Sequence, residues 1–346
     1  MKQFNKKKIL IIGAKENTSL EMMYYRAFKK MGVNTSFLQI EKKPNNYFLS
    51  KIKKIFKFLY FFYLRKKLIN FMKKNYESFD IAIVFKGVYL DSDTLLKCKS
   101  FSKKIIWINI FPDDPFNPQF IKDSNYSLLN AIKYYDFFCI WSHRILKKLK
   151  NIIKYDKLIY LPFGYDPFIH FSSRKNFKHK NLITFFGTLD FHRAKFFSKV
   201  KNIDIRVYGN NSYKYKKLLK NNKVKFYPEI QGAKMRNIMS KSLVSINILR
   251  KQNKNSHNMK TFEIPAMNCL MLTTRSAEQN ILLPEDKACL MYSTAKEFNK
   301  KLNYITNNPN KLLKIKSLGH KIIKKYSYSY RATKLLNEIN KFTNKF

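Results

Sequence analysis

The sequence predicts an α/β protein of two doubly wound, parallel-sheet domains that face each other across a cleft. Short apolar runs alternate with longer helix-compatible stretches, eleven such runs occur in about 275 residues, and a Pro- and Gly-containing break follows the sixth run. Continuous apolar strands separated by helices are typical of parallel sheets covered on both faces. Eleven strands are too many for one ordinary sheet of this kind, so we expect two sheets. The predicted strands are Lys8–Ile12, Asn34–Ile40, Ile81–Phe85, Lys104–Ile110, Asp136–Trp141, Leu158–Pro162, Leu182–Phe186, Ile203–Tyr208, Val224–Tyr227, Leu243–Ile248 and Leu270–Thr273.

The break at residues 161–180, LPFGYDPFIHFSSRKNFKHK, sets the predicted domain boundaries. Pro and Gly lie close together there, and a polar basic stretch precedes the next apolar run. We expect an N-terminal domain over residues 1–165, a hinge over 166–180 and a second domain over 181–325. Ligands of such sheets bind at the carboxyl ends of the strands, where the strand order reverses, so the cleft between the domains is the expected site.

The composition supports a folded protein with a strongly basic surface. Of the 346 residues, 45% are hydrophobic, which argues against disorder, and the formal net charge is +47. Such charge attracts polyanions, including nucleic acid, anionic lipid and phosphorylated donors. It also fits AT-rich codon usage, since Lys, Asn, Ile, Phe and Tyr are all abundant. Both interpretations stay open.

The cysteines and the N-terminus favour a cytoplasmic protein. Cys98, Cys139, Cys269 and Cys289 are widely spaced and lie in or beside apolar stretches, as reduced thiols do. The apolar run Ile9–Ile12 is too short for the core of a signal peptide.

A basic, aromatic-rich helix is expected within residues 51–74, where Phe58 to Leu64 is uninterrupted by polar residues. Its apolar run is too short for a membrane span, which needs about 20 residues. The helix either packs on the first domain or lies on an anionic membrane.

The N-terminal half offers three weak motifs. Gly13 ends the first strand, where its backbone could approach an anionic ligand next to a helix start, but the full set of glycines of a dinucleotide site is missing. Asp91 and Asp93 have the spacing of a metal-binding pair, yet they also fit a helix start, and we assign no metal. Asp113 and Asp114 follow a strand between two prolines and suit either a general base or a turn.

The second domain carries a basic helix start. Its first strand ends at Gly187, and His192, Arg193 and Lys195 follow. Cations beside free backbone N–H groups would suit a diphosphate, and a solvated basic face is the alternative.

Residues 245–280 form the most informative segment. A strand is followed by a polar loop with His257, Asn258 and Lys260, and Glu263 then enters a helix of small residues. A glutamate at such a position can accept two hydrogen bonds from a ribose diol, although helix starts favour glutamate for electrostatic reasons as well.

The stretch HNMKTFEIPAMNCLMLTTRSAEQ closely resembles the motif of the CgeB-like, or spore-maturation-type, glycosyltransferases of the group-one GT-B superfamily. FKGVYLDSDTLL, INIFPDDPFN, LPFGYDPF, ITFFGTLDFHR, SINILR, LMYSTAKEFNKKLNYITNNP and YSYSYRATKLL follow in the family's order. Residues 245–335 are the specific part of the likeness, and the first hundred residues match weakly.

The resemblance implies two Rossmann-like domains and a nucleotide-sugar donor that binds chiefly to the second. Glu263 would hold the ribose, and Arg193 with Lys195 would lie near the diphosphate. His257, Asn258 and Lys260 would line the donor pocket. Backbone N–H groups of Thr274, Arg275, Ser276 and Ala277 would meet the phosphates. Residues 326–346 would form a helix that crosses back to the first domain.

The sequence departs from the family pattern at two positions. Many retaining relatives have an earlier glutamate where this chain has Asn255, and a glycine where it has Asn268. The first departure leaves the stereochemical outcome open. If the reaction inverts the configuration of the sugar, Asp113, Asp114 or His143 is the candidate base. No metal or cofactor is expected, because cations and helix N-termini can stabilise the diphosphate leaving group.

The sequence therefore predicts a glycosyltransferase acting on a glycan, lipid-linked or protein acceptor, in surface polysaccharide or glycoconjugate synthesis. Two alternatives stay open. The charge and the 16% aromatic content suit a nucleic-acid-binding protein, but the lysines are spread along the chain. The change at Asn255 also suits a catalytically silent relative that binds a glycan.

Overall fold

The computed structural model describes residues 7–41, 55–118, 127–172, 182–200, 204–210, 212–220 and 223–343. The chain forms two compact units. Unit 1 comprises Met1–Pro162 together with Ser329–Phe346, and unit 2 comprises Phe163–Tyr328.

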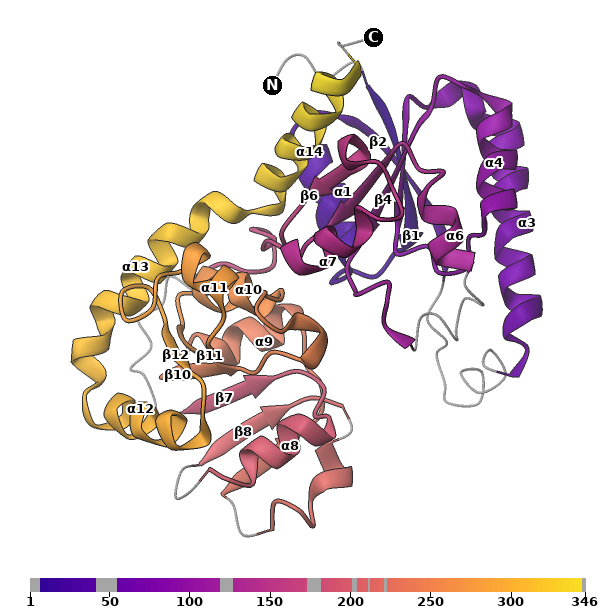
Figure 1. Ribbon diagram of the computed structural model, residues 1–346. Helices are drawn as coiled ribbons and strands as arrows, with labels where there is room; N and C mark the ends of the chain where they lie inside the picture. The colour runs from indigo at the N-terminus through magenta and orange to yellow at the C-terminus, as the bar shows by residue number, and fades with distance from the viewer. Residues whose placement is uncertain are drawn as a thin grey trace. The chain divides into compact units, whose positions relative to one another are not determined.

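Unit 1 contains a six-stranded, parallel sheet with the order β2-β1-β3-β4-β5-β6 (Figure 1). The residues Ile9 to Ile12 of its first strand are completely buried. In Figure 1, helices α3 and α4 lie on one side of this sheet, and α1 and α14 lie on the other. The strands are β1 (Lys8–Ala14), β2 (Asn34–Glu41), β3 (Ile81–Phe85), β4 (Ile106–Phe111), β5 (Phe137–Ile140) and β6 (Leu158–Tyr160). The helices are α1 (Leu20–Lys30), α3 (Lys57–Asn75), α4 (Ser92–Phe101), α6 (Ser127–Ile132), α7 (His143–Leu149) and α14 (Tyr328–Thr343), with short 3₁₀ turns η2 (Tyr76–Ser78) and η3 (Tyr155–Lys157).

Unit 2 contains a second six-stranded, parallel sheet with the order β12-β11-β10-β7-β8-β9. Its core is built from apolar residues of the strands, of helices α8 and α12 and of the connecting segments. The strands are β7 (Ile183–Phe186), β8 (Ile205–Tyr208), β9 (Val224–Tyr227), β10 (Val244–Asn247), β11 (Leu270–Thr274) and β12 (Leu290–Tyr292). The helices are α8 (Phe191–Phe197), α9 (Gly232–Met239), α10 (Lys260–Ala266), α11 (Ala277–Leu282), α12 (Ala295–Asn307) and α13 (Leu313–Ile323), with 3₁₀ turns η4 (Ser212–Tyr215), η5 (Lys251–Asn253), η6 (Pro309–Leu312) and η7 (Lys324–Tyr326).

The predicted α/β fold with two parallel sheets is confirmed. Each of the eleven predicted strands overlaps one of β1 to β11, and β12, a strand of only three residues, was not predicted. The chain returns to unit 1 through α14, the helix expected over residues 326–346. The breaks between the units fall after Pro162 and after Tyr328, where the sequence predicted 165 and 325. Residues 173–180 of the expected hinge lie outside the described residues.

Asp91 and Asp93, which have the spacing of a metal-binding pair, lie at the start of a helix, as the alternative interpretation predicted. Asp91 is the N-cap of α4, its side chain accepts a hydrogen bond from the backbone N–H of Thr94 at 2.9 Å, and Asp93 lies in the first turn. The Asp91 carboxylate also pairs with Arg65 at 2.6 Å. The carboxylate of Asp91 is therefore bound by Thr94 and Arg65, and this residue has a structural role.

Candidate functional site

The strand order of unit 2 reverses between β7 and β10, so the carboxyl ends of these two strands define the expected ligand edge. The loops that leave β7 and β8 come very close together at this edge. A Cβ atom on Gly209 would lie 1.9 Å from the carbonyl oxygen of Gly187, and Gly187 itself has a positive φ of 148°. A glycine is therefore required at both positions, and Gly187 serves to bring two strand-end loops together.

Arg193 joins the two strands on either side of this reversal. Its side chain is buried, Nη1 donates to the carbonyl oxygen of Thr188 at 2.8 Å, and Nη2 donates to that of Ile248 at 2.6 Å. Burial, followed by the nearby charge of Arg250, lowers the pKa of Arg193 to about 10, so the guanidinium stays charged at neutral pH. It places a positive charge at the ligand edge while its hydrogen bonds hold the loops. Lys195, in contrast, is exposed in the last turn of α8.

A network of amide and hydroxyl groups fixes the start of α10 at the ends of β10 and β11. The side-chain oxygen of Asn258 accepts from the backbone N–H of Thr261 at 3.1 Å, and Asn258 also donates to Asn247 at 2.9 Å. Gln279 Oε1 accepts from Thr261 at 2.8 Å and from Thr273 at 3.1 Å. These groups are neutral and mostly buried, so the network holds the start of α10 in place without charge.

His257 is an anchoring residue in this structure. Its ring is completely buried, and Nε2 accepts from the backbone N–H of Phe163 at 3.3 Å. Nδ1 lies 3.0 Å from a carboxylate oxygen of Glu278. Because Nε2 accepts, the ring proton belongs on Nδ1 and is donated to Glu278. The resemblance placed His257 in the donor pocket, and the structure uses both of its nitrogens to hold the loop before α10.

Glu263 lies in α10, nearly buried at 3% exposure, with two cationic or potentially cationic neighbours. Its Oε2 pairs with the Lys260 amine, and its Oε1 lies 3.8 Å from Nε2 of His170. The Nδ1 of His170 accepts from the backbone N–H of Asp166 at 3.2 Å, so Nε2 carries a proton and faces the carboxylate. Burial alone would raise the pKa of Glu263, but the charge of Lys260, the nearby His170 ring and the hydrogen bond from Lys260 outweigh it and lower the pKa below the ordinary value. The carboxylate is thus held ionised.

The segment after β11 uses its side chains for structure. Thr274 donates to the Tyr292 hydroxyl at 3.4 Å, and the side chain of Ser276 caps α11 by accepting from the backbone N–H of Gln279 at 3.2 Å. Ala277 is the first residue of that helix. Arg275 donates to two carboxylates, those of Glu285 and Glu297, at 2.6 and 2.5 Å. Its guanidinium is therefore engaged by protein carboxylates, and its backbone N–H, which the resemblance placed at the phosphates, donates to the carbonyl oxygen of Tyr292 at 2.7 Å.

The four candidates of the N-terminal half lie in unit 1. Gly13 is packed against Glu21, since a Cβ atom on Gly13 would lie 2.6 Å from the Cγ of that side chain. Asp113 lies 3.2 Å from the Lys86 amine.

Two further candidates of unit 1 are involved in local packing. Asp114 is nearly buried, pairs with Arg144 at 2.9 Å and also accepts from the backbone N–H of Phe116, as the turn interpretation expected. His143, the first residue of α7, stacks on Tyr160 with ring centroids 3.6 Å apart.

The two departures from the family pattern have a conformational reason. Asn255 and Asn268 both adopt the left-handed conformation, with φ of 59° and 54°. Asn268 follows the C-cap of α10, where glycine is the usual residue and asparagine is the common substitute. Asparagine tolerates this conformation better than a glutamate would, so Asn255 suits its turn.

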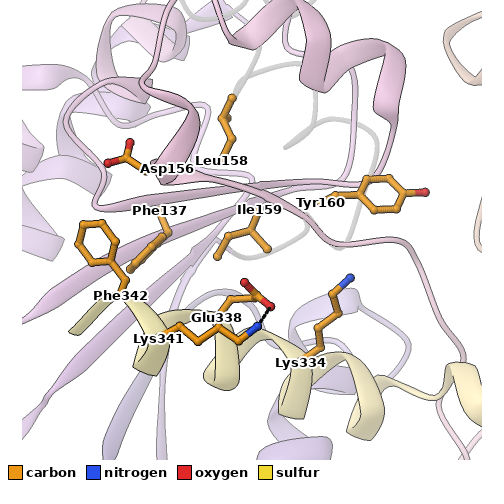
Figure 2. Close-up of a pocket in the computed structure, with 9 residues that line it drawn as sticks. All are labelled: Phe137, Asp156, Leu158, Ile159, Tyr160, Lys334, Glu338, Lys341 and Phe342. Carbon is orange, nitrogen blue, oxygen red and sulfur yellow. Dashed lines mark hydrogen bonds and ion pairs between the residues drawn. The ribbon is translucent and has the colours of Figure 1, made fainter. Parts of the chain in front are cut away.

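A pocket of ≈ 410 Å³ lies in unit 1 between α14 and the edge strand β6 (Figure 2). Glu338 and Lys341, which line it from α14, form an ion pair at 3.1 Å. None of the residues singled out from the sequence lines it. The lining residues are Phe137, Asp156, Leu158, Ile159, Tyr160, Lys334, Glu338, Lys341 and Phe342.

Sequence reasoning missed two residues of the unit 2 edge. His170 lies far from Glu263 in the chain, and no local pattern joins them. Gln279 could have been found, because Ser276 and Gln279 have the spacing of a capping box. No group of three metal-ligating side chains occurs in the described ranges of the chain.

The comparisons with known proteins agree with this architecture. Residues 193–337 match the model of a family described as glycosyl transferase-like. No curated protein matches the chain at a significant level. Among solved structures, Anabaena HepE in complex with UDP and glucose is 9% identical, with a TM-score of 0.66 over 97% of this chain and 100% of that one.

Two other solved structures share the fold at similarly low identity. Sucrose-phosphate synthase from Thermosynechococcus elongatus is 9% identical, with a TM-score of 0.70 over 98% of this chain and 100% of that one. A glycosyltransferase from Rickettsia africae is 12% identical, with a TM-score of 0.66 over 96% of this chain and 97% of that one. The chain therefore has the GT-B fold, and its residues 193–337 carry the match to the glycosyl transferase-like family.

Proposed function

We propose that this protein is a metal-independent glycosyltransferase that moves a sugar from a nucleotide-diphosphate donor to a glycan, lipid-linked or protein acceptor. The observation that carries the proposal is the ionised carboxylate of Glu263, which lies inside the segment that matches the glycosyl transferase-like model. A carboxylate can accept hydrogen bonds from both hydroxyls of a ribose. The CgeB-like subtype and a role in surface polysaccharide synthesis belong to the same proposal.

Donor binding would exchange the partner of Glu263. The side chain of Glu263 is only 4% exposed, whereas the side chain of Lys260 that covers Oε2 is 26% exposed. A ribose diol would displace the Lys260 amine from Oε2, and the released cation would lie beside an anionic donor. UDP-sugars are the first donors to test, because the HepE structures hold UDP with glucose and UDP-glucose.

Cations at the ligand edge would support departure of the nucleotide diphosphate. Arg193 keeps its charge at the point where the strand order reverses, and Arg250 lies in the adjoining loop. Fixed positive charges stabilise a leaving group without solvent reorganisation. Asp113, Asp114 and His143 remain candidate bases for an inverting reaction, and Gly13 a candidate contact of unit 1.

The cytoplasm is the proposed compartment. The four cysteines are buried free thiols, and burial raises the pKa of Cys98, Cys269 and Cys289 to about 12. Thiols in this state are protonated and unreactive, which suits a reducing environment.

The decisive experiment compares Glu263→Gln with Glu285→Gln. Each variant removes one carboxylate from an ion pair in unit 2, but Glu285 pairs with Arg275 and Lys301, neither of which belongs to α10. We expect Glu263→Gln to raise the Kd for the donor by about 10- to 100-fold, because it removes charge-assisted hydrogen bonds. Glu285→Gln should leave the donor Kd unchanged.

The donor is first identified by thermal shift with a panel of UDP- and GDP-sugars, since a ligand of the folded state raises the melting temperature. Transfer or hydrolysis of the radiolabelled donor, measured with and without EDTA, then separates an enzyme from a silent relative. If no nucleotide sugar raises the melting temperature, the proposed function is wrong. If the wild type binds a donor and Glu263→Gln binds it equally well, only the assignment of Glu263 is wrong.

A further inference from the structure

Helix α3 is fastened to unit 1 by its C-terminal half. Leu64, Leu68 and Met72 lie at four-residue intervals on one face and are completely buried. Arg65 donates to the carbonyl oxygen of Tyr89 at 2.7 Å and pairs with Asp91 at 2.6 Å. These contacts fix the direction in which the rest of the helix projects.

The N-terminal part of α3 and the two residues before it expose apolar side chains. Of the seventeen large hydrophobic side chains that are exposed in the described part of the chain, six fall within nine consecutive residues. We call them the α3 patch: Ile55, Phe56, Phe58, Leu59, Phe62 and Tyr63, which are 74, 54, 72, 60, 57 and 60% exposed. Exposed apolar side chains gathered in this way indicate an interaction surface.

Cationic side chains lie on the same exposed face of α3, C-terminal to the patch. Lys66 follows Phe62 by one helical turn and Lys73 follows Lys66 by two turns, so they lie along the same side of the helix, and both are exposed. No acidic residue occurs in Lys57–Asn75. The helix therefore offers an apolar end followed by a row of positive charges.

We propose that the α3 patch docks this protein onto an anionic lipid bilayer. The aromatic and leucine side chains would enter the boundary between headgroups and acyl chains, and Lys66 and Lys73 would meet the phosphates. None of the helices in the described ranges combines the length and apolar character that a membrane-spanning segment requires. The proposal rests on α3 and does not depend on the proposed sugar transfer.

Charge complementarity favours a bilayer over a second copy of the chain. If two copies paired through this helix, neither α3 would offer a carboxylate to the lysines of the other. An anionic bilayer offers an apolar acyl-chain region to the patch and negatively charged headgroups to the lysines.

The test is co-sedimentation of the full chain with vesicles of phosphatidylcholine alone and of phosphatidylcholine with phosphatidylglycerol. We expect binding to the anionic vesicles, and a fall of about tenfold or more in the partition coefficient for Phe58→Ser/Leu59→Ser/Phe62→Ser. The matched control Phe168→Ser/Phe191→Ser/Ile281→Ser removes three apolar side chains of unit 2 that are at least as exposed, at the same net charge, and it should bind like the wild type. Lys66→Gln and Lys73→Gln should each weaken binding about fivefold.

A fluorescent variant reports whether the patch enters the lipid. Both native tryptophans, Trp107 and Trp141, are buried, so Phe62→Trp adds one exposed indole whose emission should shift to the blue on anionic vesicles. Thermal melting checks that each variant is folded. Absence of vesicle binding by the wild type overturns the proposal, as does equal binding by the patch variant, which would mean that the overall charge of +47 acts alone. The proposal also fails if sedimentation velocity shows that the patch variant changes only self-association.

Discussion

The strand ends of the two sheets differ in how their buried polar groups are satisfied. In unit 2, the side-chain amides of Asn247, Asn258 and Gln279 bond to one another and to the hydroxyls of Thr261 and Thr273. In unit 1, the buried Tyr89 hydroxyl has no hydrogen-bond partner among the described residues, and Asp113 and Asp114 after β4 are held by separate ion pairs. Both sheets have the same architecture, so the parallel sheet itself does not create the difference.

This difference indicates that the positions of polar side chains are fixed most completely at the strand ends of unit 2. The closed network of unit 2 falls within residues 193–337, which match the glycosyl transferase-like model. A network in which every member is satisfied holds its groups in one arrangement, whereas unpaired polar groups contribute nothing to hold theirs. The strand ends of unit 2 are thus held by one network of neutral side chains, whereas those of unit 1 are held by packing and by the separate ion pairs of Asp113 and Asp114.

The largest expected effect comes from removing the centre of the unit 2 network. Gln279→Ala should lower the free energy of unfolding by roughly 2–4 kcal/mol, because the hydroxyls of Thr261 and Thr273 and the carbonyl of Thr274 lose a buried partner. Equilibrium denaturation of the full chain measures the loss. Gln252→Ala, at a half-buried position of the same unit, is the control. Equal losses in the two variants would mean that the network contributes no more to the free energy of unfolding than an amide outside it.

A smaller effect should follow from the charged cluster at the far end of the same edge. The hydrogen bonds from Arg275 lower the pKa of Glu297 to about 2, compared with an ordinary value of 4.5. The stability from this pair is complete above pH 4.5 and is lost as the pH falls toward 2. Because the pair is largely solvated, Glu297→Gln should cost about 0.5–1 kcal/mol at pH 7, and the difference from wild type should shrink between pH 4.5 and pH 3.

The cluster and the network can be told apart by the same measurement. The deficit of Gln279→Ala should not change over this pH interval, because amides and hydroxyls do not titrate there. Urea unfolding of both variants and the wild type at pH 7, 4.5 and 3 provides the comparison. A deficit of Glu297→Gln that is constant with pH would show that its carboxylate is not stabilised by Arg275.

The sequence predicted the strands and helix starts better than the partners of individual side chains. Continuous apolar runs identify buried parallel strands, and the cap at Asp91 follows from a local pattern of acceptors before a helix. The engagement of Arg275 with Glu285 and Glu297 depends on how β11, β12 and α12 pack, which no local pattern encodes. The anchoring of His257 by Phe163 depends in the same way on residues that are distant in the chain. The role of Glu263 in donor binding stays a prediction.

The smallest expected effect tests the unit 1 side of the comparison, with two tyrosines as a matched pair. The hydroxyl of Tyr89 is buried without a partner in the described part of the chain, whereas that of Tyr292, also buried, accepts from Thr274 at 3.4 Å. Removing an unpaired buried hydroxyl loses no hydrogen bond, so Tyr89→Phe should lie within about 0.5 kcal/mol of the wild type in free energy of unfolding. Tyr292→Phe should cost about 1 kcal/mol by leaving the Thr274 hydroxyl without this acceptor. If Tyr89→Phe costs as much as Tyr292→Phe, the strand ends of unit 1 are as well satisfied as those of unit 2, and the contrast between the two edges disappears.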